Sequence, residues 1–174
     1  MSDQTDVHEG GCACGYVRYR MESQPLIVHC CHCSWCQRQS GSTFAVNALI
    51  EADRVTLREG DVVDVDVPSP SGAKQRISRC PNCQVAVWSY YLAMFGGIGN
   101  LVRFIRVGTL DDPGKVPPDI HIYTSSKQPW VVLPPGALVE KEYYVTKEVW
   151  PKESLERRAV LLNTAHEAAT NSTA

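Results

Sequence analysis

The sequence lacks any apolar stretch close to the roughly 18 residues that are needed to cross a lipid bilayer. Its opening residues, MSDQTDVHEGG, contain acids and a histidine and lack the apolar run of a secretory signal peptide. Neither sign of charge dominates, because 17 Lys and Arg residues stand against 19 Asp and Glu residues. This balance does not favour binding to nucleic acid or to a membrane. We therefore expect a cytoplasmic protein.

Internal repeats and long low-complexity segments are also absent from the sequence. A chain of 174 residues, with 44% hydrophobic and 21% charged residues, is typical of one globular domain with a substantial core. We expect residues 1–9 to be flexible, residues 10–150 to form the domain, and residues 151–174 to form a C-terminal helix and tail. The helix itself is expected over Ser154–Ala169, where apolar residues recur at helical spacing.

Most of the domain shows the alternation that is typical of β-strands. YVRYRM (residues 16–21) alternates polar and apolar side chains, and LIVHCC (residues 26–31) indicates a more buried strand. After it, SWCQRQSG is predicted to form a short helix that begins with Ser34 as its N-cap and ends at Gly41. The predicted fold class is therefore mainly β. Further strands are predicted over residues 43–50, 54–59, 61–67, 74–80, 85–91, 101–110, 119–126 and 130–133.

Cysteine is abundant, with eight residues in three groups. In a cytoplasmic protein, clustered cysteines are more often metal ligands than disulfide partners. Cys12 with Cys14, and Cys80 with Cys83, have the spacing of a tetrahedral zinc site, in which two close pairs come from distant segments. We predict that these four residues form a closed, structural zinc site. The alternative is four buried free cysteines.

The third group lies within HCCHCSWCQRQSG, residues 29–41. In an extended chain, Cys31 and Cys33 point to one side and Cys30 to the other. Cys36, in the first helical turn, can fold back toward Cys31 and Cys33. Three thiolates with an exchangeable fourth position form the pattern of a catalytic zinc site. The alternative is a second closed site completed by Cys30 or a histidine; otherwise Cys30 is expected to be a core cysteine.

Four segments together resemble a known family. GGCACGYVRY, CCHCSWCQRQSGS, CPNC and GTLDDP…PPDIHIYTSSKQPWVVL occur in the order found in the glutathione-dependent formaldehyde-activating enzyme family, which also includes centromere protein V. The resemblance runs from about Gly10 to about Leu138. It implies a zinc-bearing, mostly antiparallel β fold similar to that of methionine-R-sulfoxide reductases. The family motif assigns a structural zinc to the positions of Cys12, Cys14, Cys80 and Cys83, and a catalytic zinc to those of Cys31, Cys33 and Cys36.

The chain departs from the family pattern at two positions. Gln84 follows the second cysteine of CPNC, where the family usually has glycine. Arg79 precedes the first cysteine, where the family usually has an aromatic or apolar residue.

The resemblance implies two zinc ions per chain and a zinc-dependent carbon–sulfur lyase. Because a metal-bound thiol is deprotonated, an open zinc site can prepare glutathione or another small thiol for addition to a small aldehyde such as formaldehyde. The product would be an S-hydroxymethyl thiol adduct. One alternative is a non-catalytic zinc scaffold that binds a protein partner. Another is a methionine sulfoxide reductase. Such an enzyme needs a free nucleophilic cysteine, and Cys30 is the only cysteine outside the two predicted zinc sites.

Several other residues near the motifs have simpler expected roles. His121 is expected to be an ordinary strand residue rather than a proton donor, and His29 and His32 are expected to be solvated. Arg38 is expected to be solvated rather than paired with a carboxylate of glutathione. The apolar face of the C-terminal helix is expected to pack on the β domain or on another subunit, which would make a homo-oligomer. The tryptophans Trp35, Trp88 and Trp130 are expected in the core, with the wall of a pocket as the alternative.

Overall fold

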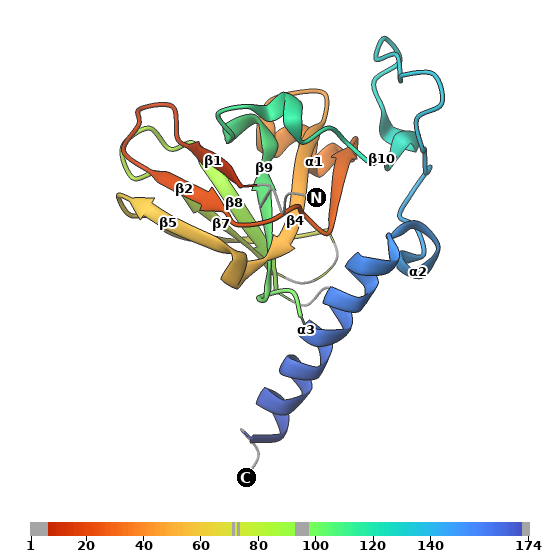
Figure 1. Ribbon diagram of the computed structural model, residues 1–174. Helices are drawn as coiled ribbons and strands as arrows, with labels where there is room; N and C mark the ends of the chain where they lie inside the picture. Colours follow the sequence, from red (N-terminus) through yellow and green to blue (C-terminus); the bar gives the residue numbers. More distant parts are fainter. Residues whose placement is uncertain (1–6, 71, 73, 93–97, 172–174) are drawn as a thin grey trace, which may run out of the picture.

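The computed structural model describes residues 7–70, 72, 74–92 and 98–171 (Figure 1). Within them, short strands dominate and helices are few, so the predicted mainly β class is confirmed. The strands are β1 (His8–Gly11), β2 (Arg18–Met21), β3 (Ile27–Cys31), β4 (Ala45–Glu51), β5 (Val55–Glu59), β6 (Val63–Pro68), β7 (Lys74–Arg79), β8 (Ala86–Tyr91), β9 (Val102–Arg106) and β10 (Ile120–Ile122). The helices are α1 (Ser34–Ser40), α2 (Thr146–Val149) and α3 (Lys152–Asn171), with short 3₁₀ turns at Ala52–Arg54, Val107–Thr109, Pro113–Lys115 and Thr124–Ser126.

The strands form two sheets. The larger sheet has the order β10-β3-β4-β9-β8-β7-β6, and the smaller has the order β1-β2-β5. Neighbouring strands are antiparallel, as predicted, apart from β3 and β10, which run parallel. The parallel pair brings the residues around His121 beside the central cysteine segment, from which they are distant in sequence.

One core fills the space between the two sheets. The apolar residues of the strand predicted over residues 16–21, Val17, Tyr19 and Met21, are fully buried there, as their alternation predicts. The Tyr19 ring meets the Trp88 ring of β8 edge to face, with centroids 5.5 Å apart. Burial of this face fixes the smaller sheet on the larger one.

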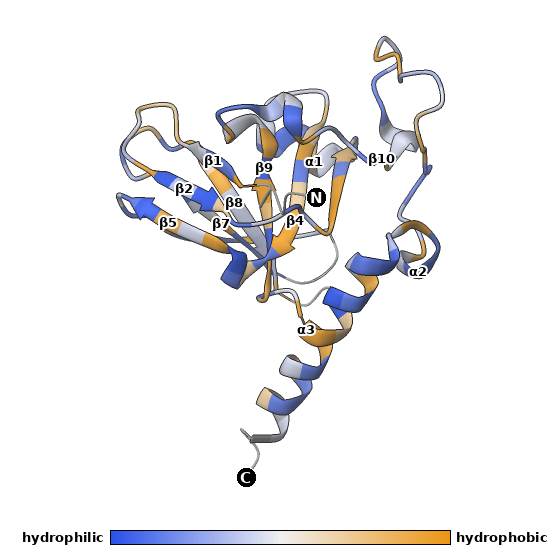
Figure 2. Cartoon of the chain, in the orientation of Figure 1, coloured by the Kyte–Doolittle hydropathy of each residue, from blue (hydrophilic) through white to orange (hydrophobic). Residues whose placement is uncertain are grey.

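A second core lies on the opposite face of the larger sheet. Leu49 of β4 and Phe104 of β9 are buried there with Tyr144 and Trp150, which precede α3. The predicted C-terminal helix is confirmed, and its N-terminal part lies beside the sheets while its far end extends beyond them (Figure 1). Hydrophobic and hydrophilic segments alternate along it (Figure 2). The α3 residues that pack on this second core are Leu155, Leu161, Leu162 and Ala165.

An ion pair joins α3 to the sheet. Arg157 of α3 donates from Nε to Oε1 of Glu51 at the end of β4, over 2.7 Å. The two side chains are only 12% and 6% exposed, so each charge is compensated mainly by the other. This contact ties the helix to the strand that borders both cores.

Two predicted boundaries need correction. Strand β1 begins at His8, two residues before the predicted start of the domain, because residues 8–11 pair with β2. Residues 130–133 do not form a strand: Val132 is 89% exposed, and prolines at 129 and 134 flank the segment. Residues 1–6 lie outside the described part of the chain. In the described part, no helix is long and apolar enough to span a bilayer.

Candidate metal centres

The first predicted site is assembled from two turns far apart in sequence. Cys12 and Cys14 lie between β1 and β2, and Cys80 and Cys83 lie between β7 and β8. All four sulfur atoms lie within 4.8 Å of one another. The Sγ atoms of Cys12 and Cys14 are 3.5 Å apart, and those of Cys14 and Cys80 are 3.7 Å apart.

These distances match a tetrahedral zinc site. With Zn–S bonds of about 2.3 Å, the edge of a sulfur tetrahedron is about 3.8 Å. The backbone N–H of Val17 also donates to Sγ of Cys12 over 3.2 Å. Burial raises the pKa of the Cys12 thiol, but this N–H and the neighbouring thiols outweigh it and lower the pKa to about 6. The four cysteines therefore fit a closed zinc centre, which we call the first centre.

The second predicted cluster also forms. The sulfur atoms of Cys31, at the end of β3, and of Cys33 and Cys36 lie within 4.8 Å of one another. Cys33, not Ser34, is the N-cap of α1, because its Sγ accepts the backbone N–H of Cys36 over 3.3 Å. The predicted end of the helix is confirmed, since Gly41 adopts φ 66° and donates its N–H to Gln37.

The protonation of this cluster favours a bound cation. Hydrogen bonds from the thiols of Cys31 and Cys36 lower the pKa of Cys33 strongly. The Cys31 thiol has its pKa raised, first by its bond to Cys33 and then by its bond to Cys36 and by burial. Three neighbouring thiols cannot all ionise alone, whereas a bound divalent metal deprotonates each of them. The three residues therefore fit zinc, and we call them the second centre.

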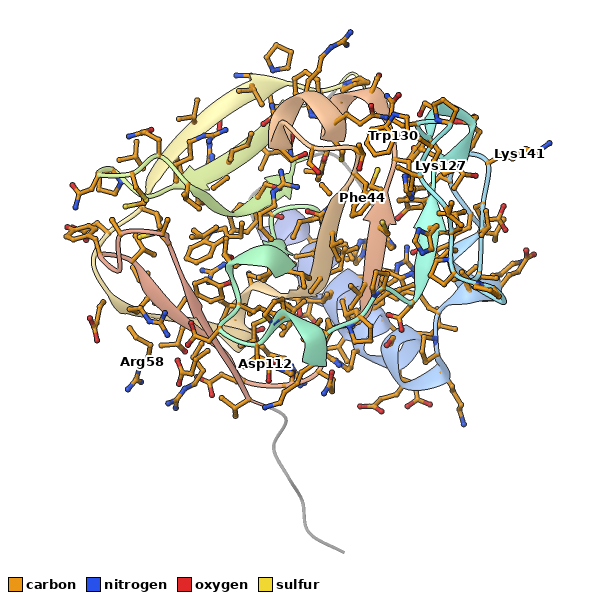
Figure 3. All side chains as sticks on the ribbon, turned by 90° about the horizontal axis from the view of Figure 1, so that it is seen from above. Phe44, Arg58, Asp112, Lys127, Trp130 and Lys141 are labelled. Carbon is orange, nitrogen blue, oxygen red and sulfur yellow. The ribbon has the colours of Figure 1, made fainter. Side chains whose placement is uncertain are left out.

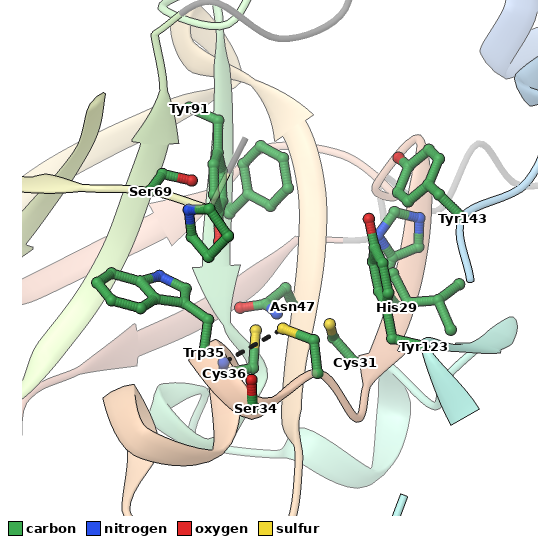
Figure 4. A pocket seen from close by; sticks show the side chains of 14 residues that line it. His29, Cys31, Ser34, Trp35, Cys36, Asn47, Ser69, Tyr91, Tyr123 and Tyr143 are labelled. Atoms are coloured by element: carbon green, nitrogen blue, oxygen red, sulfur yellow. Dashed lines mark hydrogen bonds between the residues drawn. The ribbon is translucent and has the colours of Figure 1, made fainter. Parts of the chain in front are cut away.

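A cavity of about 330 Å³ opens onto the second centre (Figure 4). This size lies within the range of small-molecule sites. The described residues that line it include no Asp, Glu, Lys or Arg. They are His29, Cys31, Cys33, Ser34, Trp35, Cys36, Asn47, Ser69, Pro70, Tyr91, Phe104, Ile122, Tyr123 and Tyr143.

His29 lies in the cavity wall, not in solvent as predicted, because β3 is covered on both sides. Its Nε2 is 2.5 Å from the hydroxyl of Tyr144, and that hydroxyl accepts the indole N–H of Trp150 over 2.7 Å. The Tyr144 hydroxyl therefore links the His29 ring to the Trp150 indole. Burial lowers the pKa of His29 to about 3, so the ring is neutral.

The strand alternation separates Cys30 from the second centre. Cys31 packs in the second core, while Cys30 faces the other side of β3. Cys30 is buried in the core, as predicted, and its Sγ lies 3.6 Å from Nε2 of His32. His32 is fully buried, against the prediction that it is solvated, and contacts His121 of β10. His121 is a strand residue of β10, as predicted, and does not line the cavity.

The three tryptophans and Arg38 differ in their burial. Trp35 lines the cavity and donates to Gln75 over 2.8 Å, and Trp88 is in the first core. Trp130 is 69% exposed, so its predicted burial is wrong; it follows a proline in an irregular loop. Arg38 is exposed, as predicted.

Sequence reasoning missed the tyrosines of the cavity wall. Tyr91, Tyr123 and Tyr143 come from β8, from the segment after β10 and from the chain before α2, so no motif links them. Tyr123 has φ 55° and ψ 41°, a left-handed conformation that is uncommon for a bulky side chain. Such outliers concentrate at functional sites.

Comparison with known proteins decides the family. The sequence profile described as "Glutathione-dependent formaldehyde-activating enzyme" matches residues 7–126. The chain belongs to this family. A relative from Halomonas elongata, provisionally named a glutathione-dependent formaldehyde-activating enzyme, is 26% identical over 129 residues, which are 72% of this chain and 80% of the relative. A crystal structure of a Rhodobacter sphaeroides protein matches with a TM-score of 0.42 and 15% identity, over 59% of this chain and 87% of that one.

The two departures from the pattern of the formaldehyde-activating family lie side by side. Gln84 has φ 61°, the left-handed conformation that favours the glycine usual in this family. Its side chain donates to the carbonyl of Pro81 over 2.8 Å, and its own carbonyl accepts Nη1 of Arg79 over 2.9 Å. Arg79 therefore stabilises the turn that Gln84 strains.

Proposed function

We propose that the protein is a zinc-dependent carbon–sulfur lyase that combines glutathione with formaldehyde to form S-hydroxymethylglutathione, and catalyses the reverse cleavage. The observation that carries the proposal is the position of the second centre, whose three cysteines line the cavity of about 330 Å³. Three protein ligands facing a cavity are typical of catalytic zinc. Membership of the formaldehyde-activating family supports the choice of substrates.

The proposal assigns two zinc ions to the chain. Cys12, Cys14, Cys80 and Cys83 hold the structural ion, and Cys31, Cys33 and Cys36 hold the catalytic one. Zinc bound at the second centre would keep a substrate thiol in its nucleophilic thiolate form at neutral pH. All eight cysteines are free of disulfides, which supports the proposed cytoplasmic location.

The reaction needs no oxidant or reductant. The sulfur atom of glutathione attacks the carbonyl carbon of formaldehyde and forms a carbon–sulfur bond. The electron pair of the carbonyl π bond moves to oxygen, and this oxygen receives the proton that the thiol gave up. The product is the S-hydroxymethyl adduct, and the reverse steps break the same bond.

The cavity wall supplies hydrogen-bond donors for the developing alkoxide. We assign this role to the phenol of Tyr123, which lines the cavity and is held by a strained backbone. Burial and then the nearby cysteines raise the pKa of Tyr123, so the phenol keeps its proton and can donate it in a hydrogen bond. His29 is a neutral wall residue because burial lowers its pKa to about 3, and its Nε2 contacts the Tyr144 hydroxyl.

Exchange spectroscopy tests the proposal directly. The rate at which free formaldehyde and glutathione interconvert with S-hydroxymethylglutathione is measured by NMR with and without the zinc-loaded protein. We expect faster exchange with the wild type and none above background with Cys36→Ser. Retention of the first zinc by the variant shows that it is folded. If the wild type leaves the exchange rate at background, the enzyme proposal is wrong.

A non-catalytic scaffold is the second candidate. Its support is the irregular loop after β10, which carries Trp130 (Figure 3). In this loop, Trp130 is 69% and Val132 is 89% exposed. Tryptophan is among the residues that are enriched at protein interfaces. This candidate would be favoured if the protein bound zinc tightly at both centres but left the rate of exchange between formaldehyde, glutathione and their adduct at background.

A further inference from the structure

Three donor atoms converge on the face of β3 opposite the second centre. Sγ of Cys30 lies 3.6 Å from Nε2 of His32, and this Nε2 lies 3.1 Å from Nδ1 of His121. All three ligand atoms lie within 4.8 Å of one another. Neither the first nor the second centre uses any of them.

The parallel pairing of β3 with β10 creates this cluster. His121 is in register with Cys30, and Ile122 is in register with Cys31. Residues in register on neighbouring strands point to the same face, so His121 joins Cys30 while Ile122 joins the cavity wall. The pairing with β10 extends to His32, whose N–H donates to the carbonyl of Ile122 over 3.0 Å. The strand alternation therefore places the His32 side chain on the same face as Cys30.

The spacing of the donors matches that around one ion. For tetrahedral zinc with Zn–S of about 2.3 Å and Zn–N of about 2.05 Å, the S···N and N···N separations are about 3.6 and 3.3 Å. The observed values are 3.6 and 3.1 Å. One thiolate and two imidazoles form a donor set that suits zinc and neighbouring transition metals.

The surroundings of His32 also favour a ligand role. Its ring is fully buried, and Nδ1 has no hydrogen-bond partner among the described residues. Of the two ring nitrogens, Nε2 is the one that faces other ligand atoms, Sγ of Cys30 and Nδ1 of His121. Hydrogen bonds from Ser126 and Gln37 to the carbonyl of His32 fix the backbone beneath the ring.

Aromatic packing orients the two imidazoles and leaves a path to the cluster. The His32 and His121 rings are nearly parallel, with centroids 5.4 Å apart, and Phe44 packs against His32 at 5.3 Å. His121 is only half-buried, so an ion could reach the cluster from its side.

We infer that Cys30, His32 and His121 form a third metal centre, which binds a zinc-type divalent ion through one thiolate and two imidazoles. This inference does not rest on the proposed function, because it concerns the other face of β3. The chain would then bind three ions, two of them on opposite sides of one strand.

Metal stoichiometry tests the third centre. The full chain is dialysed under reducing conditions against a buffer that fixes free zinc in the micromolar range, and bound zinc is measured by mass spectrometry. We expect three ions for the wild type, and two each for Cys30→Ser and His121→Asn. Equal zinc content in the wild type and in both variants would overturn the inference.

Cobalt distinguishes this centre from the second one. Cys36→Ser, the matched control, should also lose one ion, but it should remove charge-transfer absorption from a site with three thiolates. Cys30→Ser should remove the smaller contribution of one thiolate. If the two difference spectra coincide, Cys30 acts on the second centre and the third centre does not exist. Circular dichroism shows whether each variant is folded. If Cys30→Ser is misfolded, the zinc content of His121→Asn tests the third centre in its place.

Discussion

The first and second centres are both built from cysteine sulfur atoms, but their surroundings differ. The first has four cysteines from two tight turns, and its sulfur atoms are surrounded by one another and by backbone N–H groups. The second has three cysteines at the end of one strand and the start of one helix, and it lines a cavity. In the proposed division of roles, the number of sulfur ligands and the space beside them, rather than the ligand type, separate the structural site from the reactive one.

The largest expected effect is the loss of Cys80. This residue is fully buried and links the two halves of the first centre, so Cys80→Ser leaves three thiolates in a site built for four. We expect the free energy of unfolding to fall by about 5 kcal/mol or more, because structural zinc contributes directly to folding. Denaturant unfolding with measured zinc content checks this. A fully metallated variant with an unchanged midpoint would contradict the structural role.

Loss of Cys36 should affect activity far more than folding. Cys36→Ser removes one of three ligands of the second centre, and we expect the exchange rate to fall at least about 100-fold. The first zinc and the fold should survive, which zinc analysis and circular dichroism show. If Cys36→Ser unfolds the chain as Cys80→Ser does, the two centres do not divide into a structural and a reactive one.

A smaller effect is expected from the cavity wall. Tyr123→Phe removes one hydrogen-bond donor and should lower kcat about 10- to 100-fold at unchanged zinc content. The matched control is Tyr16→Phe, because the Tyr16 hydroxyl donates to Asp61 on the surface and lies outside the cavity. Equal rates for the two variants would remove Tyr123 from the proposed mechanism.

The smallest effect concerns the turn of the first centre. A left-handed backbone at a residue other than glycine costs about 1 kcal/mol, and Gln84→Gly removes this cost. The same substitution loses the hydrogen bond to Pro81. We expect a net gain of about 0.5 kcal/mol. Gln84→Ala loses the bond and keeps the strain, so it should be destabilising. Thermal unfolding of both variants measures the difference, and a Gly variant less stable than the Ala variant would refute the strain argument.

The sequence predicted the features that depend on local spacing. The paired cysteines, the separation of Cys30 from Cys31, the alternation of β2 and the end of α1 all follow from the strand and helix periods. The family profile, and the position of each cysteine within it, could be recognised for the same reason.

Features that depend on distant contacts were not predictable. The pairing of β10 with β3 decides that His121 meets His32, and nothing in either segment encodes that register. The tyrosines of the cavity come from three separate segments. β1 forms only because β2 is available to pair with it, and residues 130–133 have strand-like residues without a partner strand.

The alternation of donors along β3 has a genetic consequence. Cys30 and Cys31 are neighbours in the sequence but belong to opposite faces of the sheet. A substitution at one of them affects one face, whereas the insertion or deletion of a single codon within this strand would exchange the faces of all the strand residues after it. We therefore expect natural variants of this segment to change in residue type but to keep its length.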